Sequence, residues 1–193
     1  MIPMIEQLYR HICKLVPDLI TDQEKLLPFF SFRSIKKDEL LLSENEICDT
    51  VYFVNKGCLY LFYGDDHEKQ VIHFALENWW ITDYKTFPDC KPAVYSIAAM
   101  ENSAITCINR KSYETLLLQL PLMALYFNKI HERAYGAALF KQKTFATVSK
   151  KDFYRHFRDT YPDLIRRIPD AIFASYMGVS LETLRTLQAW YIS

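Results

Sequence analysis

Residues 168–184 read IPDAIFASYMGVSLETL, two short helical runs on either side of Gly178. Ala174 supplies a small side chain where two helices would cross, and Val179 and Leu184 supply apolar side chains to fill the space between them. A tight turn between helices needs a positive φ, which glycine adopts without steric cost. The stretch therefore predicts a helix-turn-helix, and an ordinary helical hairpin is the alternative that the spacing leaves open.

Helices are also expected on both sides of this stretch. Ser149 with Asp152 should cap a helix over 150–160, and Ser180 should cap the last one. The expected C-terminal helices cover residues 150–160, 163–167, 168–177 and 181–191. Pro169 is expected at the first helical position of the third of these. The N-terminal residues 4–30 are also predicted to be helical, with an interruption at Pro17 and a second short helix capped by Thr21 and Glu24.

A long helix is expected over residues 122–147, after a short one over 111–120 that stops at Pro121. Small residues cluster around Gly136 and would let a second helix approach closely. The apolar positions of the long helix include Leu122, Leu125, Tyr126, Ile130, Ala134, Ala137, Ala138 and Phe140. We predict that this helix joins two copies of the chain, and packing against its own β-domain is the alternative.

Residues 32–110 carry short alternating or β-branched runs, separated by turn residues about every ten positions. Asn45 is expected in a left-handed conformation, and Gly57 in a tight hairpin. Strands are predicted over residues 31–35, 40–42, 51–54, 58–63, 70–74, 93–99 and 103–108. This pattern is typical of an antiparallel sandwich or barrel.

Charge is unevenly distributed along a chain whose net charge is zero. From residue 141 to the end there are nine Lys and Arg against five Asp and Glu, so the remainder is acidic. A basic C-terminal segment behind an acidic body is typical of a nucleic-acid-binding end, with a chance fluctuation as the alternative.

The chain lacks the residues that several classes of function need. The five cysteines are widely spaced without a C-x-x-C pair, the five histidines lack metal-ligand spacing, and no G-x-S-x-G or glycine-rich phosphate loop occurs. We therefore expect no catalytic residues, no metal site and no cofactor. The N-terminus does not resemble a signal peptide and no run is apolar enough to span a bilayer, so a soluble cytoplasmic protein without a membrane partner is expected.

The order of these segments resembles the Crp/Fnr family of transcription regulators, in the style common in Bacteroidetes, over about residues 25–188. The matching blocks are DTVYFVNKGCLY at 49–60, NWWITD at 78–83, YSIAAME at 95–101, YPDL at 161–164 and ASYMGVSLETL at 174–184. The resemblance implies an α+β fold: an N-terminal antiparallel β-barrel of the cyclic-nucleotide-binding, jelly-roll type, a long dimerisation helix and a C-terminal helix-turn-helix. The corresponding domains are 1–120, 121–148 and 149–193.

The resemblance also implies partners. They are DNA, a second copy of the chain, a small-molecule effector and, for such a regulator, RNA polymerase. The rival function is a dimeric small-molecule-sensing or scaffolding protein whose helix-turn-helix has drifted away from DNA binding.

Two departures from the family pattern concern its sites. Cyclic-nucleotide-binding members have Gly-Glu and later an arginine where this chain has Trp79-Trp80 and Ala93–Ile97. Burying a phosphate without a cationic partner costs several kcal/mol, so we predict no tight cyclic AMP binding. The four-cysteine iron–sulfur signature of the oxygen sensors is missing as well. In the recognition helix, Arg185-Thr186 replaces the usual Ser-Arg, and Trp190 to Ile192 make the end unusually apolar.

Candidate site residues follow from these arguments. The effector pocket is expected to involve Tyr60, Phe62, His73, Trp79, Trp80, Asp83, Tyr95 and Ser96, with Phe87 as a further aromatic wall; core packing of these side chains is the alternative. The DNA-binding residues are expected to be Ser180, Glu182, Thr183, Arg185, Thr186 and Gln188. Phosphate contacts are expected from Lys150, Lys151, Arg155, Arg158, Arg166 and Arg167, with a solvated surface as the alternative for each.

Overall fold

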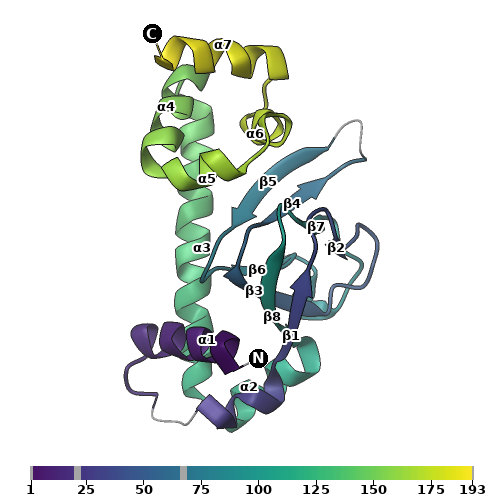
Figure 1. Cartoon of the computed structure of the whole chain (residues 1–193). Coiled ribbons are helices and arrows are strands. Elements are labelled where there is room, and N and C mark those ends of the chain that lie inside the picture. The colour runs from purple at the N-terminus through teal and green to yellow at the C-terminus, as the bar shows by residue number, and fades with distance from the viewer. Residues whose placement is uncertain (1, 20–22, 66–68, 193) are drawn as a thin grey trace. The chain divides into compact units, whose positions relative to one another are not determined.

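A computed structural model describes residues 2–19, 23–65 and 69–192 of the chain. Thr21, the expected cap of a second N-terminal helix, lies outside the described residues. The chain divides into two compact units (Figure 1): Met1–Tyr63 with His73–Glu132, and Gly64–Ile72 with Arg133–Ser193. Within the described residues, no helix is both long enough and apolar enough to cross a membrane.

Two four-stranded sheets form the centre of the first unit, except that the first residues of β5 belong to the second unit. The strands are β1 (Ser31–Ile35), β2 (Leu40–Leu42), β3 (Thr50–Lys56), β4 (Leu59–Tyr63), β5 (Gln70–Ala75), β6 (Trp80–Ile81), β7 (Ser96–Ala99) and β8 (Ser103–Asn109). One sheet has the order β1-β8-β3-β6 and the other the order β2-β7-β4-β5. The predicted α+β fold of jelly-roll type is therefore confirmed, with the refinement that the sheets do not close into one barrel.

Two details of the strand prediction differ from the structure. Strand β7 begins at Ser96 and not at residue 93, because residues 94 and 95 form a bend after an isolated bridge at Pro92. Strand β6 was not predicted, since two residues, Trp80 and Ile81, are too few to show an alternating pattern. The expected left-handed conformation is confirmed at Asn45 (φ 70°), and Gly57, between β3 and β4, also has a positive φ (102°).

Helix α1 (Ile2–Leu15) covers one face of the first sheet, where it contacts β3 and β8. Ile5, Leu8 and Ile12 are all buried, and their spacing of three and four residues places them on one helical face. Strand β3 is buried along Val51–Asn55, because one of its faces packs in the core and the other faces helices. The expected second N-terminal helix consists of two 3₁₀ turns, η1 (Gln23–Lys25) and η2 (Leu27–Phe29).

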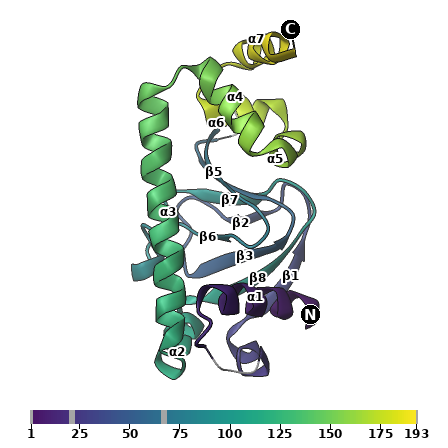
Figure 2. The same cartoon turned by 90° about the vertical axis from the view of Figure 1, so that its left-hand side faces the viewer.

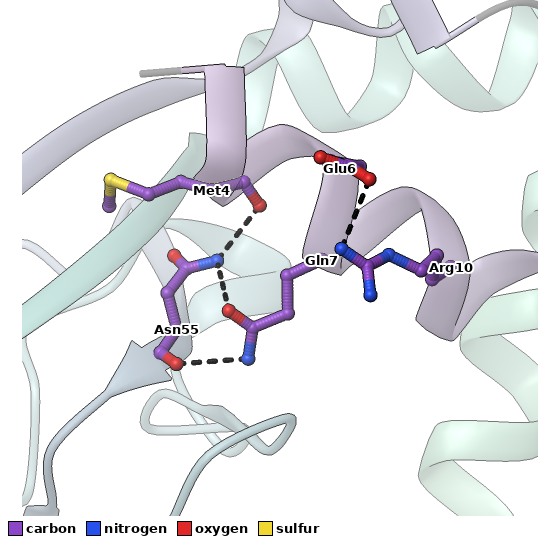
Figure 3. A network of polar contacts seen from close by, with 5 residues as sticks. All are labelled: Met4, Glu6, Gln7, Arg10 and Asn55. Carbon is purple, nitrogen blue, oxygen red and sulfur yellow. Dashed lines mark hydrogen bonds and ion pairs between the residues drawn. The ribbon is translucent and has the colours of Figure 1, made fainter.

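A polar network fastens α1 to the end of β3 (Figure 3). The buried Asn55 donates from Nδ2 to the Met4 carbonyl at 2.9 Å and to Gln7 Oε1 at 3.5 Å, while Gln7 Nε2 donates to the Asn55 carbonyl at 2.9 Å. Thr106 Oγ1 donates to Asn55 Oδ1 at 2.6 Å. An amide with this many partners satisfies its buried polar atoms and fixes the position of the helix on the sheet.

Two more helices follow the sheets. Asn109 caps α2 (Arg110–Gln119) by accepting from the Ser112 amide at 2.8 Å, and α3 runs over Leu122–Thr147 as predicted. The first turns of α3 pack on their own unit: Tyr126 is fully buried, and its hydroxyl accepts from Trp80 Nε1 at 2.8 Å. From residue 131 to residue 140, by contrast, every side chain of α3 is exposed.

Four short helices form most of the second unit (Figure 2). They are α4 (Lys150–Thr160), α5 (Pro162–Arg167), α6 (Asp170–Met177) and α7 (Leu181–Ile192), close to the predicted ranges. Ser149 accepts from the Asp152 amide at 3.1 Å and Ser180 from the Thr183 amide at 3.1 Å, as expected of caps. Pro169 precedes α6 and does not open it, because its ψ of 142° is not helical.

Candidate nucleic-acid interface

Aromatic and apolar side chains hold the four short helices together. The rings of Phe157 and Phe173 lie 4.8 Å apart, centroid to centroid, and Phe153, Met177 and Leu184 are buried with them. Leu184 is fully buried, as its predicted role of filling the space between α6 and α7 requires. This packed core is the scaffold on which α7 is presented.

The turn between α6 and α7 ends α6 in a left-handed residue. Gly178 has φ 62° and ψ 47°. Its amide donates to the Ser175 carbonyl at 3.0 Å, and the Val179 amide donates to the Ala174 carbonyl at 3.1 Å. This pair of bonds is a Schellman motif, for which glycine is the preferred residue. The predicted glycine turn of the helix-turn-helix is therefore present.

The first two turns of α7 present an exposed polar face. Glu182, Thr183, Arg185 and Thr186 are all exposed, while Leu184 on the opposite side is buried. Ser180 lies at the N-cap, where its hydroxyl is 2.9 Å from Thr183 Oγ1. The structure thus brings five of the six predicted DNA-binding residues together at one end of α7.

Gln188, the sixth predicted DNA-binding residue, lies differently. Its Nε2 donates to Asp170 Oδ1 in α6 at 2.8 Å, and its side chain is half-buried. The amide group therefore links the two helices of the motif in this structure.

The apolar end of α7 docks on α4. Lys151 Nζ lies 3.5 Å from the centre of the Trp190 ring, and Arg155 lies 4.9 Å from it. Tyr191 donates to Asp159 Oδ1 at 2.8 Å, and Arg158 lies 4.5 Å from its ring. Cation–π contacts of this kind stabilise by about 0.5–2 kcal/mol each, which gives the aromatic end of α7 a structural role.

Most of the six predicted phosphate-contacting cations have partners within the unit. Arg155 is 3.3 Å from Asp152, and Arg166 pairs with Asp163. Lys150 Nζ donates to the Met177 carbonyl at the end of α6. Arg166 remains largely exposed, with 73% of its side chain accessible, so that a phosphate can still approach it.

A segment of the β4–β5 hairpin belongs to this unit, and sequence reasoning missed it. The Val71 amide donates to Ser175 Oγ at 2.8 Å, and Ser175 Oγ donates to the Lys69 carbonyl at 2.6 Å. Gln70 Nε2 donates to the Ser175 carbonyl. Contacts between segments about a hundred residues apart leave no signal in local periodicity.

Lys141 of α3 is enclosed beside this hairpin segment. Its Nζ donates to the Ile72 carbonyl and lies 4.0 Å from the centre of the Tyr176 ring. Burial lowers the pKa of Lys141 to about 8, from 10.5 in the unfolded chain. The unfolded state therefore binds this proton more tightly, so that charged Lys141 opposes folding below pH 8 and the penalty fades as the pH rises toward 10.5.

Replacing this lysine by an apolar side chain should stabilise the fold at neutral pH. A pKa difference of this size corresponds to roughly 3 kcal/mol, and the lost contacts to Ile72 and Tyr176 reduce the gain. We expect Lys141→Met to raise the free energy of unfolding by about 1–2 kcal/mol at pH 7 and by less at pH 10. Denaturant titrations at both pH values measure this, with the exposed Lys143→Met as the control. A gain that does not shrink at pH 10 would contradict the assignment.

The predicted effector-pocket residues all lie in the first unit, where they pack in separate groups. Tyr60 stacks on Phe62 at 5.2 Å and His73 on Trp79 at 5.9 Å, and Tyr95 lies 6.4 Å from Tyr63, all between ring centroids. The first pair is buried, whereas Trp79 is 41% exposed.

The remaining predicted pocket residues take part in structural hydrogen bonds. The buried Asp83 accepts from the Lys85 amide at 3.0 Å and from the Val94 amide at 2.8 Å, which fixes the chain between β6 and β7. Ser96 accepts from the Glu44 amide at 3.0 Å, and Trp80 is the buried partner of Tyr126. An effector in this region would have to displace such contacts.

Metal chemistry has no support in the described part of the chain, where no group of three His, Cys, Asp or Glu side chains could hold an ion. All five cysteines are outside disulfides.

Comparison with known proteins shows which domain family and which folds the chain resembles. Residues 32–119 match the profile of the family described as "Cyclic nucleotide-binding domain". No curated protein matches the sequence significantly. Among solved structures, the c-di-GMP responsive global regulator CLP of Xanthomonas campestris is 13% identical, with a TM-score of 0.70 over 87% of this chain and 89% of that one.

Two further structures have a similar fold. The CooA mutant of Carboxydothermus hydrogenoformans is 13% identical, with a TM-score of 0.69 over 92% of this chain and 83% of that one. A protein described as a transcriptional regulator of the crp/fnr family, from Eubacterium rectale, is 15% identical, with a TM-score of 0.69 over 92% and 85%.

Residues 32–119 thus match a cyclic nucleotide-binding domain, and the fold of the chain is similar to that of the three solved structures. The predicted resemblance to the Crp/Fnr family is confirmed at the level of this domain and of the fold, while the Bacteroidetes subtype stays a prediction.

Proposed function

We propose that this chain is a sequence-specific DNA-binding transcription regulator that acts in the cytoplasm as a homodimer. The observation that carries the proposal is the exposed polar face of α7, with Ser180 to Thr186 mounted on a packed helix-turn-helix. A helix presented in this way can enter the major groove with its N-terminal residues toward the base edges. The proposal is one of regulation and not of catalysis.

The exposed part of α3 supports the homodimer. Leu125 and Leu139 lie two heptads apart and are 43% and 48% exposed, and Tyr135 on the same side is 67% exposed. A Cβ added to Gly136 would meet nothing within 4 Å, so that the space around it is open in the single chain. An apolar stripe of this kind on a surface marks a site of association.

The proposed regulator function also has consequences for the effector and for the further partners. The segment from Trp79 to Ile97 holds no arginine, so we propose that the regulator does not respond to cyclic AMP. A different small molecule and RNA polymerase are the further partners that this function implies.

Arg185 is the only basic residue in the sequence of α7. Replacing it therefore tests whether α7 recognises DNA bases. An arginine paired with a guanine contributes about 1–3 kcal/mol of discrimination. We expect Arg185→Ala to weaken binding to the cognate site about 5- to 150-fold and to leave binding to random DNA nearly unchanged.

Fluorescence titration with DNA from upstream of the chain's own gene, at several salt concentrations, measures both affinities. Arg166→Ala is the matched control, because a phosphate-contacting residue should weaken both affinities equally and lower the salt slope by about one. Equal affinity of the unaltered chain for its upstream DNA and for random DNA would contradict the proposal.

A second function is a dimeric sensor or scaffold that has lost specific DNA binding. The cations of α4 favour this function. Lys151 and Arg155, two of the predicted phosphate contacts, lie against the Trp190 ring and are therefore partly engaged within the chain. The same titration separates the two functions, because the second predicts a dimer without site-selective binding.

A further inference from the structure

A cavity of about 190 Å³ lies in the first unit. Its wall includes Tyr84, Phe87, Arg110, Tyr113, Phe127 and His131. These residues come from the segment after β6, from α2 and from the first turns of α3. Of all the residues predicted for the effector pocket, Phe87 alone lines this cavity.

The cavity has aromatic walls in fixed contact with one another. The Tyr113 and Phe127 rings lie 4.6 Å apart, and Phe87 meets Tyr113 edge to face at 5.6 Å. Tyr84 and His131 form a second edge-to-face pair at 5.2 Å. Such walls suit a flat ring, which can stack on one side chain and meet another at its edge.

Among the residues that line this cavity, Arg110 is the one that carries a permanent positive charge. The guanidinium carbon of Arg110 lies 5.4 Å from the centre of the Phe87 ring and 5.9 Å from that of Tyr113, and its side chain is 28% exposed. Glu114 Oε1 accepts from both Nε, at 3.0 Å, and Nη2, at 2.9 Å. One carboxylate oxygen thus occupies two of the five donors that a guanidinium has.

The other polar groups of the wall are donors or neutral. Burial lowers the pKa of His131 and raises that of Tyr113, so that at neutral pH the imidazole is uncharged and the phenol keeps its proton. No Asp or Glu is among the residues that line the cavity. The residues that line the cavity therefore offer a cation and hydroxyl donors, and the nearby carboxylate of Glu114 is held by Arg110 itself.

We propose that this cavity binds a small aromatic carboxylate, with its ring among Phe87, Tyr113 and Phe127 and its carboxylate on Arg110. The volume equals roughly six water molecules in the liquid, which suits one ring and one carboxylate and is below the range of drug-sized ligands. A guanidinium matches the two oxygens of a carboxylate, whereas the higher charge of a phosphate would call for more cations than one. The inference does not rest on the proposed DNA binding.

Ligand-observed NMR titration of the full chain with benzoate tests the proposal, with benzamide as the uncharged probe of the same shape. We expect benzoate to saturate one site at submillimolar to millimolar concentration, and benzamide to bind at least tenfold more weakly. Arg110→Met should weaken benzoate at least tenfold. The neighbouring cation variant Lys111→Ala should leave it unchanged, because Lys111 does not line this cavity.

Two outcomes overturn the proposal: no saturable benzoate binding up to 10 mM (about tenfold beyond the expected range), or benzamide binding as tightly as benzoate. These results come from the unaltered chain, so they stand even if Arg110→Met does not fold. Benzoate binding that persists unchanged in a folded Arg110→Met would also overturn it.

Discussion

Leu139→Glu is expected to dissociate the dimer and to weaken site-selective DNA binding at least about a hundredfold. Leu139 lies in the exposed stretch of α3, on the side that also carries Leu125 and Tyr135. A glutamate buried in a helix seam without a cationic partner costs several kcal/mol, and about 2.8 kcal/mol already corresponds to a hundredfold change. Loss of the second subunit then removes half of the DNA contacts.

Arg133→Glu is the matched control for this variant. Arg133 is also exposed, is not among the apolar positions of α3, and lies about 120° around the helix from Leu139. The control should remain a dimer in sedimentation velocity and keep its DNA affinity within about threefold. A Leu139→Glu protein that sediments like the unaltered chain would show that the seam lies elsewhere.

Leu184→Ala is expected to lower the free energy of unfolding of the helix-turn-helix by about 2–5 kcal/mol. Leu184 is fully buried between α6 and α7 in a core of large side chains whose rings pack on one another, so that the cavity left behind cannot be filled by small movements. Because α7 depends on this contact for its position, site-selective DNA binding should fall together with the stability.

Thermal and denaturant unfolding, followed by circular dichroism, measure the effect. Leu187→Ala is the control, because Leu187 is the same residue type in the same helix but only half-buried, and its truncation should cost about 1 kcal/mol. Equal losses for the two variants would mean that Leu184 does not plug the space between the helices.

Local patterns were sufficient to predict the long helix and the end of α6, although the expected second N-terminal helix proved to be two 3₁₀ turns. Residues 122–147 form one helix as expected, because an uninterrupted helical period is bounded by Pro121 on one side and by the Ser149 cap of the next helix on the other. Gly178 ends α6 with a positive φ for the reason that its sequence context indicated.

The alternative in which the long helix packs on its own β-domain holds for its first turns, and the joining of two copies stays a prediction for the exposed part. The sequence places Tyr126 and Phe140 in one apolar stripe, but Tyr126 is fully buried in the first unit while Phe140 is 60% exposed. The helical spacing of apolar residues shows that they lie on one face of the helix. It does not show which surface covers that face, because the covering residues lie far away in the chain.

The candidate sites were predictable to different degrees. The exposed face of α7 follows from helical spacing once Leu184 is placed in the core, and five of the six predicted residues lie on it or at its cap. The partner of Gln188 could not be predicted, because Asp170 lies eighteen positions away on another helix. The contacts of Lys141 and Ser175 with the β4–β5 hairpin depend on the tertiary fold in the same way.

The central claim is that two copies of the chain, joined along α3, present their α7 helices to DNA together. Sedimentation equilibrium of the full chain with and without its upstream DNA tests this most directly. We expect a particle of twice the 22.8 kDa chain mass, binding one DNA duplex per two chains. A chain that stays monomeric at all concentrations and binds its site one to one would contradict the account.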